Sequence, residues 1–380
     1  MQPSIVSFLF GFVTASGTGP VPNARHECDV VVAGGSLASA AAAVAAGNAS
    51  NSTRVCFIEI TDWPGGQASA SGIPAMDFGL QYLNFPKNIP QSLAELLTDG
   101  KMGGPRYNPG ECEYLPKCFA PEWVAAWVLH RLAGLPNVAV FLNTTVVKVD
   151  SDATGRVTGL HAVQRTPTAL HPSGWDRPLS EALSDWYSPI PSSYFNKTEL
   201  HFVVAPSGVV VEATEFGDVL VLTDGIAVAQ GVELEAENST EYEERCGNPA
   251  AFTVFAKWNT TLQPLGNTRA LPDWLKVRRF WTMARHTPRS FDPYHSHNHD
   301  LIPQLAPGDH YPVTSNCNDI DANVFLPLET ARATARGGAW AGGMNVTAIA
   351  MAEAQAWACY HKVQNGILST RPEDSGTMNE

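Results

Sequence analysis

A glycine-rich turn near the start of the chain has the residue types and the spacing of a phosphate-binding site. Val30 to Val32 is a run of β-branched residues that predicts a strand, and Ala38 to Ala46 is an alanine-rich run that predicts a helix. Gly34 and Gly35 lie between the two. The first N–H groups of such a helix, together with its positive dipole end, attract a pyrophosphate. The pattern therefore predicts that this turn binds a dinucleotide.

Two serines stand at the later glycine positions of the usual G-x-G-x-x-G pattern. Ser36 adds a hydroxyl that can donate to a phosphate oxygen, and Ser39 is small enough for the helix to pack closely on the strand. A short strand-to-helix turn in some other α/β domain remains the alternative interpretation.

A second strand and a second pair of glycines follow. Arg54 to Ile60 has strand composition and carries Glu59, about 25 residues beyond the first glycine, close to the spacing at which a carboxylate binds a ribose hydroxyl. Gly65, Gly66 and Gln67 suit a cofactor that extends past its pyrophosphate, because paired glycines let the chain pass closely against it. A nicotinamide-dependent dehydrogenase is the less favoured alternative, since Glu59 would reject a 2′-phosphate and the glycine pair would have no purpose.

These residues resemble a known family, the FAD-dependent oxidoreductases of the glutathione-reductase-like FAD/NAD(P)-binding superfamily, in the subgroup with a GGS turn and a WPGGQ segment. The resemblance extends from Asp29 to about Gly366 and is carried by further segments, namely 108–124 (NPGECEYLPKCFAPEWV), 174–179 (GWDRPL) and 209–220 (VVVEATEFGDVL). It implies an α/β fold, with a Rossmann-like FAD-binding domain in three ββα layers and an inserted and following β-rich substrate region. It also implies FAD as the cofactor.

The resemblance adds three residues to the cofactor site. In the predicted strand Thr145 to Val149, the backbone of Val146 would contact the adenine, although an ordinary buried strand residue fits the sequence equally well. Ala213 and Thr214 would pass near the ADP portion, with Gly217 close by; the alternative is a strand end capped by Thr214 and a glycine turn. The sequence names no catalytic acid or base.

The resemblance divides the chain into an FAD-binding domain at 28–231 and a substrate-side region at 232–366. Within the first, residues 29–98 and 200–231 form the nucleotide-binding part, and 99–199 are an insertion. Residues 367–380 form a polar tail. Related enzymes continue past this point with a strand and a glycine-bearing helix that close over the flavin, so we expect either a shortened chain or weakened retention of the cofactor.

Local patterns predict further elements in the order of the chain. Helices are expected at 92–97, from about Pro121 to Leu132 and from about 346 to 364, where apolar residues recur at helical spacing. Strands are expected at 138–142, 156–165, 200–205, 209–212 and 252–258. The proline-rich and aromatic stretch 171–195 is expected to wrap the surface or cap a pocket, with Asp176 and Arg177 paired.

Composition is that of a globular protein. Hydrophobic residues make up 44% and charged residues 16% of the 380, and the formal net charge of −13 argues against a nucleic-acid surface and gives no reason to expect an anionic membrane. A tract at 295–300 (HSHNHD) has the residue types of a metal site, but no cysteine or carboxylate cluster supports it, and we assign no metal. The arginines at 278, 279 and 285 either receive a substrate carboxylate or form a solvated face.

The first 17 residues predict a signal peptide, with an apolar core from Ile5 to Val13 that is too short to span a bilayer. A buried N-terminal strand is the alternative. Seven N-x-S/T triplets favour the secretory pathway and an extracellular glycoprotein. Their asparagines are Asn48, Asn51, Asn143, Asn196, Asn238, Asn259 and Asn345.

Cysteine usage agrees with secretion without proving it. There are seven cysteines, and Cys56, inside an apolar strand, is most simply a buried thiol. Cys112 and Cys118 lie in one short loop, for which we favour a disulfide over a redox-active pair.

Together the sequence predicts a secreted FAD-dependent oxidoreductase that transfers hydride from a small organic or sugar-like substrate to flavin. The alternative is a non-catalytic secreted glycoprotein with a degenerate or truncated flavoprotein fold.

Overall fold

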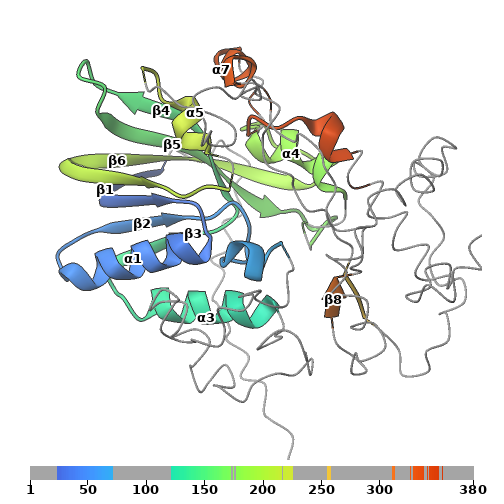
Figure 1. Ribbon diagram of the computed structural model, residues 1–380, viewed down its shortest axis with the longest axis horizontal. Coiled ribbons are helices and arrows are strands. Elements are labelled where there is room, and N and C mark those ends of the chain that lie inside the picture. The colour runs from blue at the N-terminus through green and yellow to red at the C-terminus, as the bar shows by residue number, and fades with distance from the viewer. Residues whose placement is uncertain are drawn as a thin grey trace, which may run out of the picture.

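The computed structural model describes residues 24–71, 121–172, 174, 177–215, 217–225, 255–257, 310–312, 326, 328–337, 340, 342–350 and 353. Most of them form one six-stranded mixed sheet and the helices that pack on it (Figure 1). The strand order is β3-β2-β1-β6-β5-β4. The bounds are β1 Ala24–Ala33, β2 Val55–Ile58, β3 Val138–Phe141, β4 Thr144–Ser151, β5 Val157–Pro167 and β6 Phe195–Glu212.

The sheet has a parallel half and an antiparallel half. Strand β1 pairs in parallel with β2 on one side and with β6 on the other, and β2 pairs in parallel with β3. Strands β6, β5 and β4 form an antiparallel meander. The structure thus confirms the predicted α/β class, with β6 shared between the two halves.

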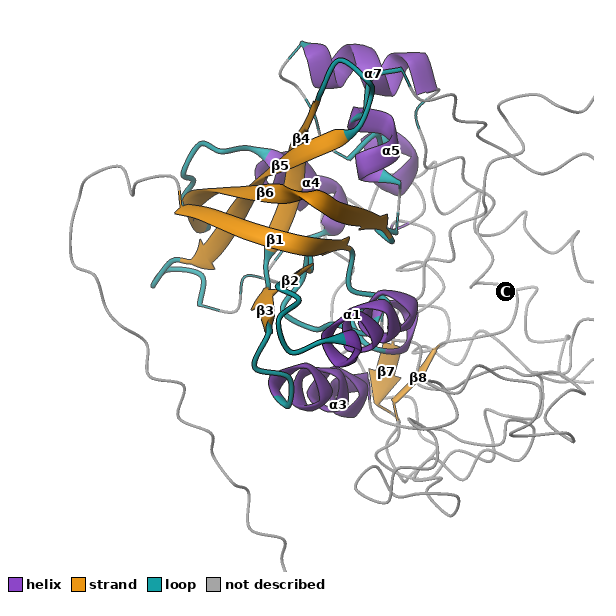
Figure 2. Cartoon of the chain, turned by 90° about the vertical axis from the view of Figure 1, so that its left-hand side faces the viewer, coloured by secondary structure: helices purple, strands orange, loops and turns teal. Residues whose placement is uncertain are grey.

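Two helices cover one face of the parallel half (Figure 2). Helix α1 (Leu37–Ala49) and helix α3 (Pro121–Ala133) pack on Val32 and Phe57 through an apolar cluster. The three remaining helices are α4 (Leu179–Tyr187), α5 (Asp218–Leu222) and α7 (Leu328–Arg336), with a short 3-10 turn at Gly66–Ala68. A separate strand pair joins β7 (Phe255–Lys257) to β8 (His310–Pro312).

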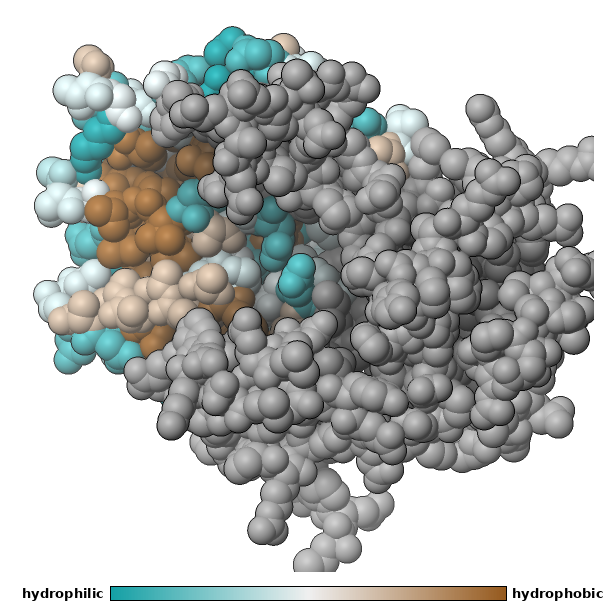
Figure 3. All heavy atoms as spheres, in the orientation of Figure 1, coloured by the Kyte–Doolittle hydropathy of each residue, from teal (hydrophilic) through white to brown (hydrophobic). Residues whose placement is uncertain are grey.

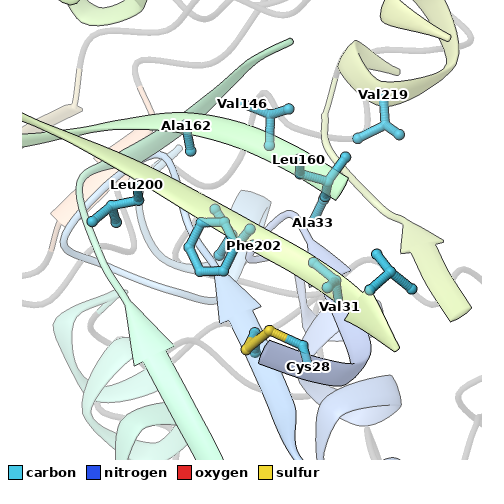
Figure 4. Packing of buried hydrophobic residues seen from close by; sticks show 12 residues of the cluster. Cys28, Val31, Ala33, Val146, Leu160, Ala162, Leu200, Phe202 and Val219 are labelled. Atoms are coloured by element: carbon cyan, nitrogen blue, oxygen red, sulfur yellow. A yellow bond between two sulfur atoms is a disulfide. The ribbon is translucent and has the colours of Figure 1, made fainter. Parts of the chain in front are cut away.

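The other face of the sheet carries a second apolar cluster, drawn in Figure 4, which draws residues from both halves. Val31 of β1 lies in it with Leu160 of β5 and Phe202 of β6, all three fully buried. The sheet is strongly curled, because the rings of Phe141 on β3 and Phe202 lie 4.8 Å apart although β2 and β1 separate their strands. Burial on both faces explains why β1 has a continuous run of valines rather than an alternating pattern.

Hydrophobic residues also reach the surface of the described part beside α1, where β1 and β6 run (Figure 3). Val209 of β6 is 54% exposed. No helix among the described residues is long and apolar enough to cross a membrane.

The structure differs from the sequence prediction in the return strand. Two strands were expected, at 200–205 and 209–212, because Pro206 and Gly208 resemble a turn; the structure has one strand, β6. Its pairing with β1 shifts between Cys28 and Val30, so that residues 205–208 lie opposite Asp29 alone. A bulge absorbs the proline and glycine without ending the strand.

Several other predictions have a definite outcome. Helix α3 and strands β3, β4 and β5 lie where they were expected, and β7 falls inside the strand predicted at 252–258. Helix α4 forms inside the stretch interpreted as a wrap, and its Arg177 neighbour pairs with Asp185. The last predicted helix is described over 346–350, where Asn345 Oδ1 accepts a hydrogen bond from the N–H of Ala348.

The prediction that Cys56 is a free thiol is wrong, because it forms a disulfide with Cys28 on the neighbouring strand. Both sulfurs point into the second apolar cluster. The two residues are 28 positions apart, so no local pattern indicated the bond. The signal peptide, the helix at 92–97, the 112–118 pair, Asp176, the 278–285 arginines and the 295–300 tract lie outside the described residues.

Replacing Cys28 and Cys56 together by Ala should lower the free energy of unfolding by about 3–4 kcal/mol, from the loop entropy of a closure of this length. Guanidinium unfolding under non-reducing conditions measures the change. Each single replacement should cost nearly as much as the double, because either one removes the bond. Single and double variants that unfold at the wild-type midpoint would contradict the disulfide.

Candidate functional site

One pocket lies where the ends of β1 and β2 meet the start of β4 and the loop after β6. It encloses about 390 Å³ of space not filled by atoms, part of it open to solvent. Five of the predicted cofactor residues line it, and these are Gly34, Gly35, Glu59, Val146 and Thr214. Its other lining residues are Ile58, Ile60, Thr144, Thr145, Tyr187, Glu215 and Asp218.

Gly34 lets the ends of β1 and β6 touch. Its φ is +115°, and a Cβ there would lie 1.9 Å from the carbonyl oxygen of Ala213. The Gly34 N–H donates to the carbonyl of Ile58 at 2.8 Å, so the same residue also holds the end of β2. Only glycine combines this conformation with this approach.

The two serines of the turn stabilise the start of α1. Ser36 is its N-cap, and its hydroxyl accepts a hydrogen bond from the N–H of Ser39 at 3.2 Å. The buried Ser39 donates its own hydroxyl to the carbonyl of Ala213 at 3.2 Å. The helix start is therefore attached to the loop after β6, and its free N–H groups are directed at the turn.

The second glycine pair lies against the first. The N–H of Gly65 donates to the carbonyl of Gly35 at 2.6 Å, and Ser36 and Gly65 form an isolated parallel bridge. A Cβ on Gly66 would lie 3.1 Å from the Cα of Ser36. Gln67, next in the chain, is exposed. The structure thus brings together two segments that the sequence identified separately.

Glu59 is buried at the end of β2 with its carboxylate against the turn. One oxygen, Oε1, accepts hydrogen bonds from the backbone N–H of Thr61 at 2.8 Å and from its hydroxyl. The other, Oε2, lies 1.6 Å from the place that a Cβ on Gly35 would take. Burial raises the pKa of Glu59 to about 7, against the two bonds from Thr61, which lower it.

The meander side of the pocket is held by a buried arginine. Arg165 of β5 donates to the hydroxyl of Thr145 at 2.6 Å and to the carbonyl of Ile60, and it packs over the ring of Trp186 at 4.5 Å. Burial lowers the pKa of this guanidinium to about 10. These contacts hold the start of β4, and with it Val146, beside the end of β2.

Sequence reasoning missed a buried acid and phenol in the same pocket. The hydroxyl of Tyr187, at the end of α4, donates to Oδ2 of Asp218 at 2.7 Å, while Oδ1 of Asp218 is buried with no hydrogen-bond partner. Burial raises the pKa of Asp218 to about 7, and Glu212 raises it further. A buried unpaired acceptor is costly, so this oxygen is suited to a donor brought by a ligand.

The loop after β6 is capped from both ends. Glu212 accepts hydrogen bonds from the N–H groups of Thr214 and Val219, each at 2.6 Å, and the hydroxyl of Thr214 accepts one from the N–H of Asp218 at 2.9 Å. Thr214 therefore both caps this turn and lines the pocket. The two interpretations weighed for it from the sequence are compatible.

A dinucleotide fits these residues for three structural reasons. The turn at Gly34 and Gly35 leaves room that any side chain would fill, the carboxylate of Glu59 lies beside it, and Oδ1 of Asp218 has an unused acceptor. Only the motif around Gly217 hinted at Asp218. No sequence signal pointed to Tyr187, because its partner is 31 residues away.

Residues 29–171 match the model of a family described as FAD dependent oxidoreductase. The match includes the glycine turn, Glu59, the second glycine pair and Val146, and it ends before Ala213. It makes FAD the cofactor that this region indicates, in an enzyme family of oxidoreductases. No curated protein sequence matches the chain significantly.

Solved structures with a similar fold are flavoprotein-sized chains of which this one covers less than half. L-proline dehydrogenase from P. horikoshii has 13% identity and a TM-score of 0.23, over 50% of this chain and 23% of that one. A geranylgeranyl bacteriochlorophyll reductase-like protein from Thermoplasma acidophilum has 12% and 0.30, over 53% and 43%. The 3-ketosteroid-Δ4-(5α)-dehydrogenase from Rhodococcus jostii RHA1 has 15% and 0.28, over 51% and 47%.

Gly34→Ala should destabilise the protein far more than Gly155→Ala. Both glycines have positive φ, but a Cβ at Gly34 meets the backbone of Ala213, whereas nothing lies within 4 Å of a Cβ at Gly155. We expect a loss of about 1 kcal/mol for Gly155→Ala from conformation alone, and about 3 kcal/mol or more for Gly34→Ala. Urea unfolding compares the two, and equal losses would show that the ends of β1 and β6 are not in contact.

Asp218→Asn should change how stability depends on pH. A carboxyl whose folded pKa lies above its unfolded value stabilises the protein fully below the unfolded pKa and loses that contribution as pH rises through the folded pKa. With an ordinary value of 3.8 and a folded value of about 7, wild type should lose about 2–4 kcal/mol between pH 4 and 7.5 relative to the variant. Chemical unfolding at both pH values measures this, and a difference that does not vary with pH would refute the shift.

Proposed function

We propose, on the premise that residues 29–171 belong to the FAD-dependent oxidoreductases, that this protein binds FAD through the described pocket and oxidises a small organic or sugar-like substrate. The observation that carries the proposal is the meeting of the glycine turn, Glu59 and the loop after β6 around one pocket. When bound, FAD supplies the hydride acceptor. The assignment to the GGS and WPGGQ subgroup is part of the proposal.

The pocket is proposed to hold the ADP half of the cofactor. The N–H groups at the start of α1, beside Gly34 and Gly35, would bind the pyrophosphate without a lysine. Glu59 would accept hydrogen bonds from the ribose hydroxyls through Oε2, since Oε1 is engaged by Thr61. Val146 would present its backbone to the adenine.

The loop after β6 would close this half of the site. Ala213 and Thr214 lie against the glycine turn, and Oδ1 of Asp218 would accept a hydrogen bond from the nucleotide. This bond would replace the missing partner of a buried oxygen, which binding would therefore stabilise. Gly65, Gly66 and Gln67 would follow the cofactor away from the pocket.

We further propose that the protein is a secreted glycoprotein. Three asparagines of N-x-S/T triplets, Asn48, Asn51 and Asn196, are exposed and would accept glycans without disturbing the core. Asn48 lies in the last turn of α1 rather than in the following loop. The disulfide between Cys28 and Cys56 suits an oxidising compartment.

The purified protein should bind FAD, and ADP should compete with it, because the pocket is proposed to read the ADP half. FMN, which lacks that half, should bind at least about 100-fold more weakly, since several charge-assisted hydrogen bonds are lost. The visible absorption spectrum and the quenching of flavin fluorescence measure both affinities.

Glu59→Gln tests the ribose contact against the matched control Glu122→Gln, at an exposed position of α3. We expect the affinity for FAD to fall about 10-fold in the first and to stay unchanged in the second, because a neutral acceptor binds a hydroxyl more weakly than a carboxylate. No flavin binding by wild type would contradict the cofactor proposal and favour the non-catalytic glycoprotein. Equal affinity of FAD and FMN would contradict the assignment of the pocket.

A further inference from the structure

The outer face of the meander carries a cluster of two histidines and a carboxylate. Asp150 of β4, His161 of β5 and His201 of β6 lie on three adjacent strands. His161 and His201 are directly opposite each other in the ladder, and their rings stack with centroids 4.3 Å apart. Oδ2 of Asp150 lies 2.6 Å from Nε2 of His161 and 3.7 Å from Nε2 of His201.

The cluster is separate from the dinucleotide pocket. Asp150 is four residues along β4 from Val146, a distance of about 13 Å at the rise of a strand. The three side chains are between 27% and 36% exposed, so an ion in water can reach them. None of them lines the pocket.

The backbone leaves room at the centre of the cluster. Gly159 lies opposite Asp150 on β5, and a Cβ there would lie 2.8 Å from Nε2 of His201. Any other residue at this position would therefore fill the space into which the imidazole and carboxylate atoms point.

We propose that Asp150, His161 and His201 bind a divalent transition-metal ion of the zinc class. Their ligand atoms all lie within 4.8 Å of one another. A tetrahedral ion with bonds of about 2.0–2.1 Å holds its ligand atoms about 3.3 Å apart. The separations of 2.6 and 3.7 Å lie on either side of that value, and an imidazole turns easily about χ2 to redirect its lone pair.

The ligand set decides the chemical class of the ion. Two imidazoles and one carboxylate suit Zn²⁺ and Cu²⁺ and leave at least one position for water, whereas Mg²⁺ and Ca²⁺ prefer oxygen ligands. Cu²⁺ should bind more tightly than Zn²⁺ in such a site.

The surroundings orient the carboxylate and limit the affinity. Lys148 binds Oδ1 of Asp150 at 2.8 Å, which leaves Oδ2 directed at the histidines. The positive charges of Lys148 and Arg25, the latter opposite His201 on β1, oppose a cation. Burial, and then the neighbouring His161, lower the pKa of His201, which favours the neutral imidazole that a metal needs.

The test is a titration of the chelator-treated full-length protein with ZnCl₂ in a calorimeter. His161→Gln and His201→Gln should each lower the affinity of one Zn²⁺ equivalent by more than the about 10–100-fold typical of an outer-sphere partner. The control His130→Gln, at an exposed position of α3, should keep wild-type affinity. Because the tract at 295–300 also contains histidines, every variant is repeated with His295, His297 and His299 replaced by Gln.

A second readout excludes a merely structural effect. With one equivalent of Cu²⁺, electron paramagnetic resonance of the background lacking the 295–300 histidines should show coupling to two imidazole nitrogens, reduced to one in His201→Gln. Circular dichroism checks that each variant is folded. Absence of a Zn²⁺ equivalent in wild type, or one that survives in both His161→Gln and His201→Gln, would overturn the proposal whether or not the protein binds FAD.

Discussion

The contact between the bare backbone of Gly34 and the carbonyl of Ala213 is the constraint on which the site depends. It lets β1 and β6 end side by side, and this brings the loop after β6 against the glycine turn. Ser39 stabilises the same contact from the helix side by donating to that carbonyl. A side chain at position 34 would separate the strand ends, so the pocket would lose the wall that carries Thr214 and Asp218.

The pocket holds groups that do not stabilise the empty protein. Glu59 and Asp218 are buried carboxyls whose pKa values are raised to about 7 by burial, and one oxygen of Asp218 has no partner. Their retention makes physical sense if a ligand supplies hydrogen-bond donors, because buried acceptors then become satisfied. The core around Phe57 and Phe202 carries the stability that offsets this cost.

Local pattern and long-range contact explain what could be predicted. The first strand, α1 and the glycine turn follow from adjacent residues, so their place in the fold was evident from the sequence. The disulfide of Cys28 with Cys56 and the bond of Tyr187 to Asp218 join residues that only the folded sheet brings together. Their identities are ordinary for strand and helix positions, so no periodicity or spacing could reveal them.

A single extra residue in β4 lets one strand serve two sites. Val146 pairs with Ala162 but Lys148 pairs with His161, so Val147 is a bulge opposite no partner of its own. Without it, side chains would alternate strictly and Asp150 would share the buried face of Val146. The bulge turns Lys148 and Asp150 to the outer face, where His161 and His201 lie. The strand thus begins as a wall of the dinucleotide pocket and ends, on its other face, beside the histidine pair.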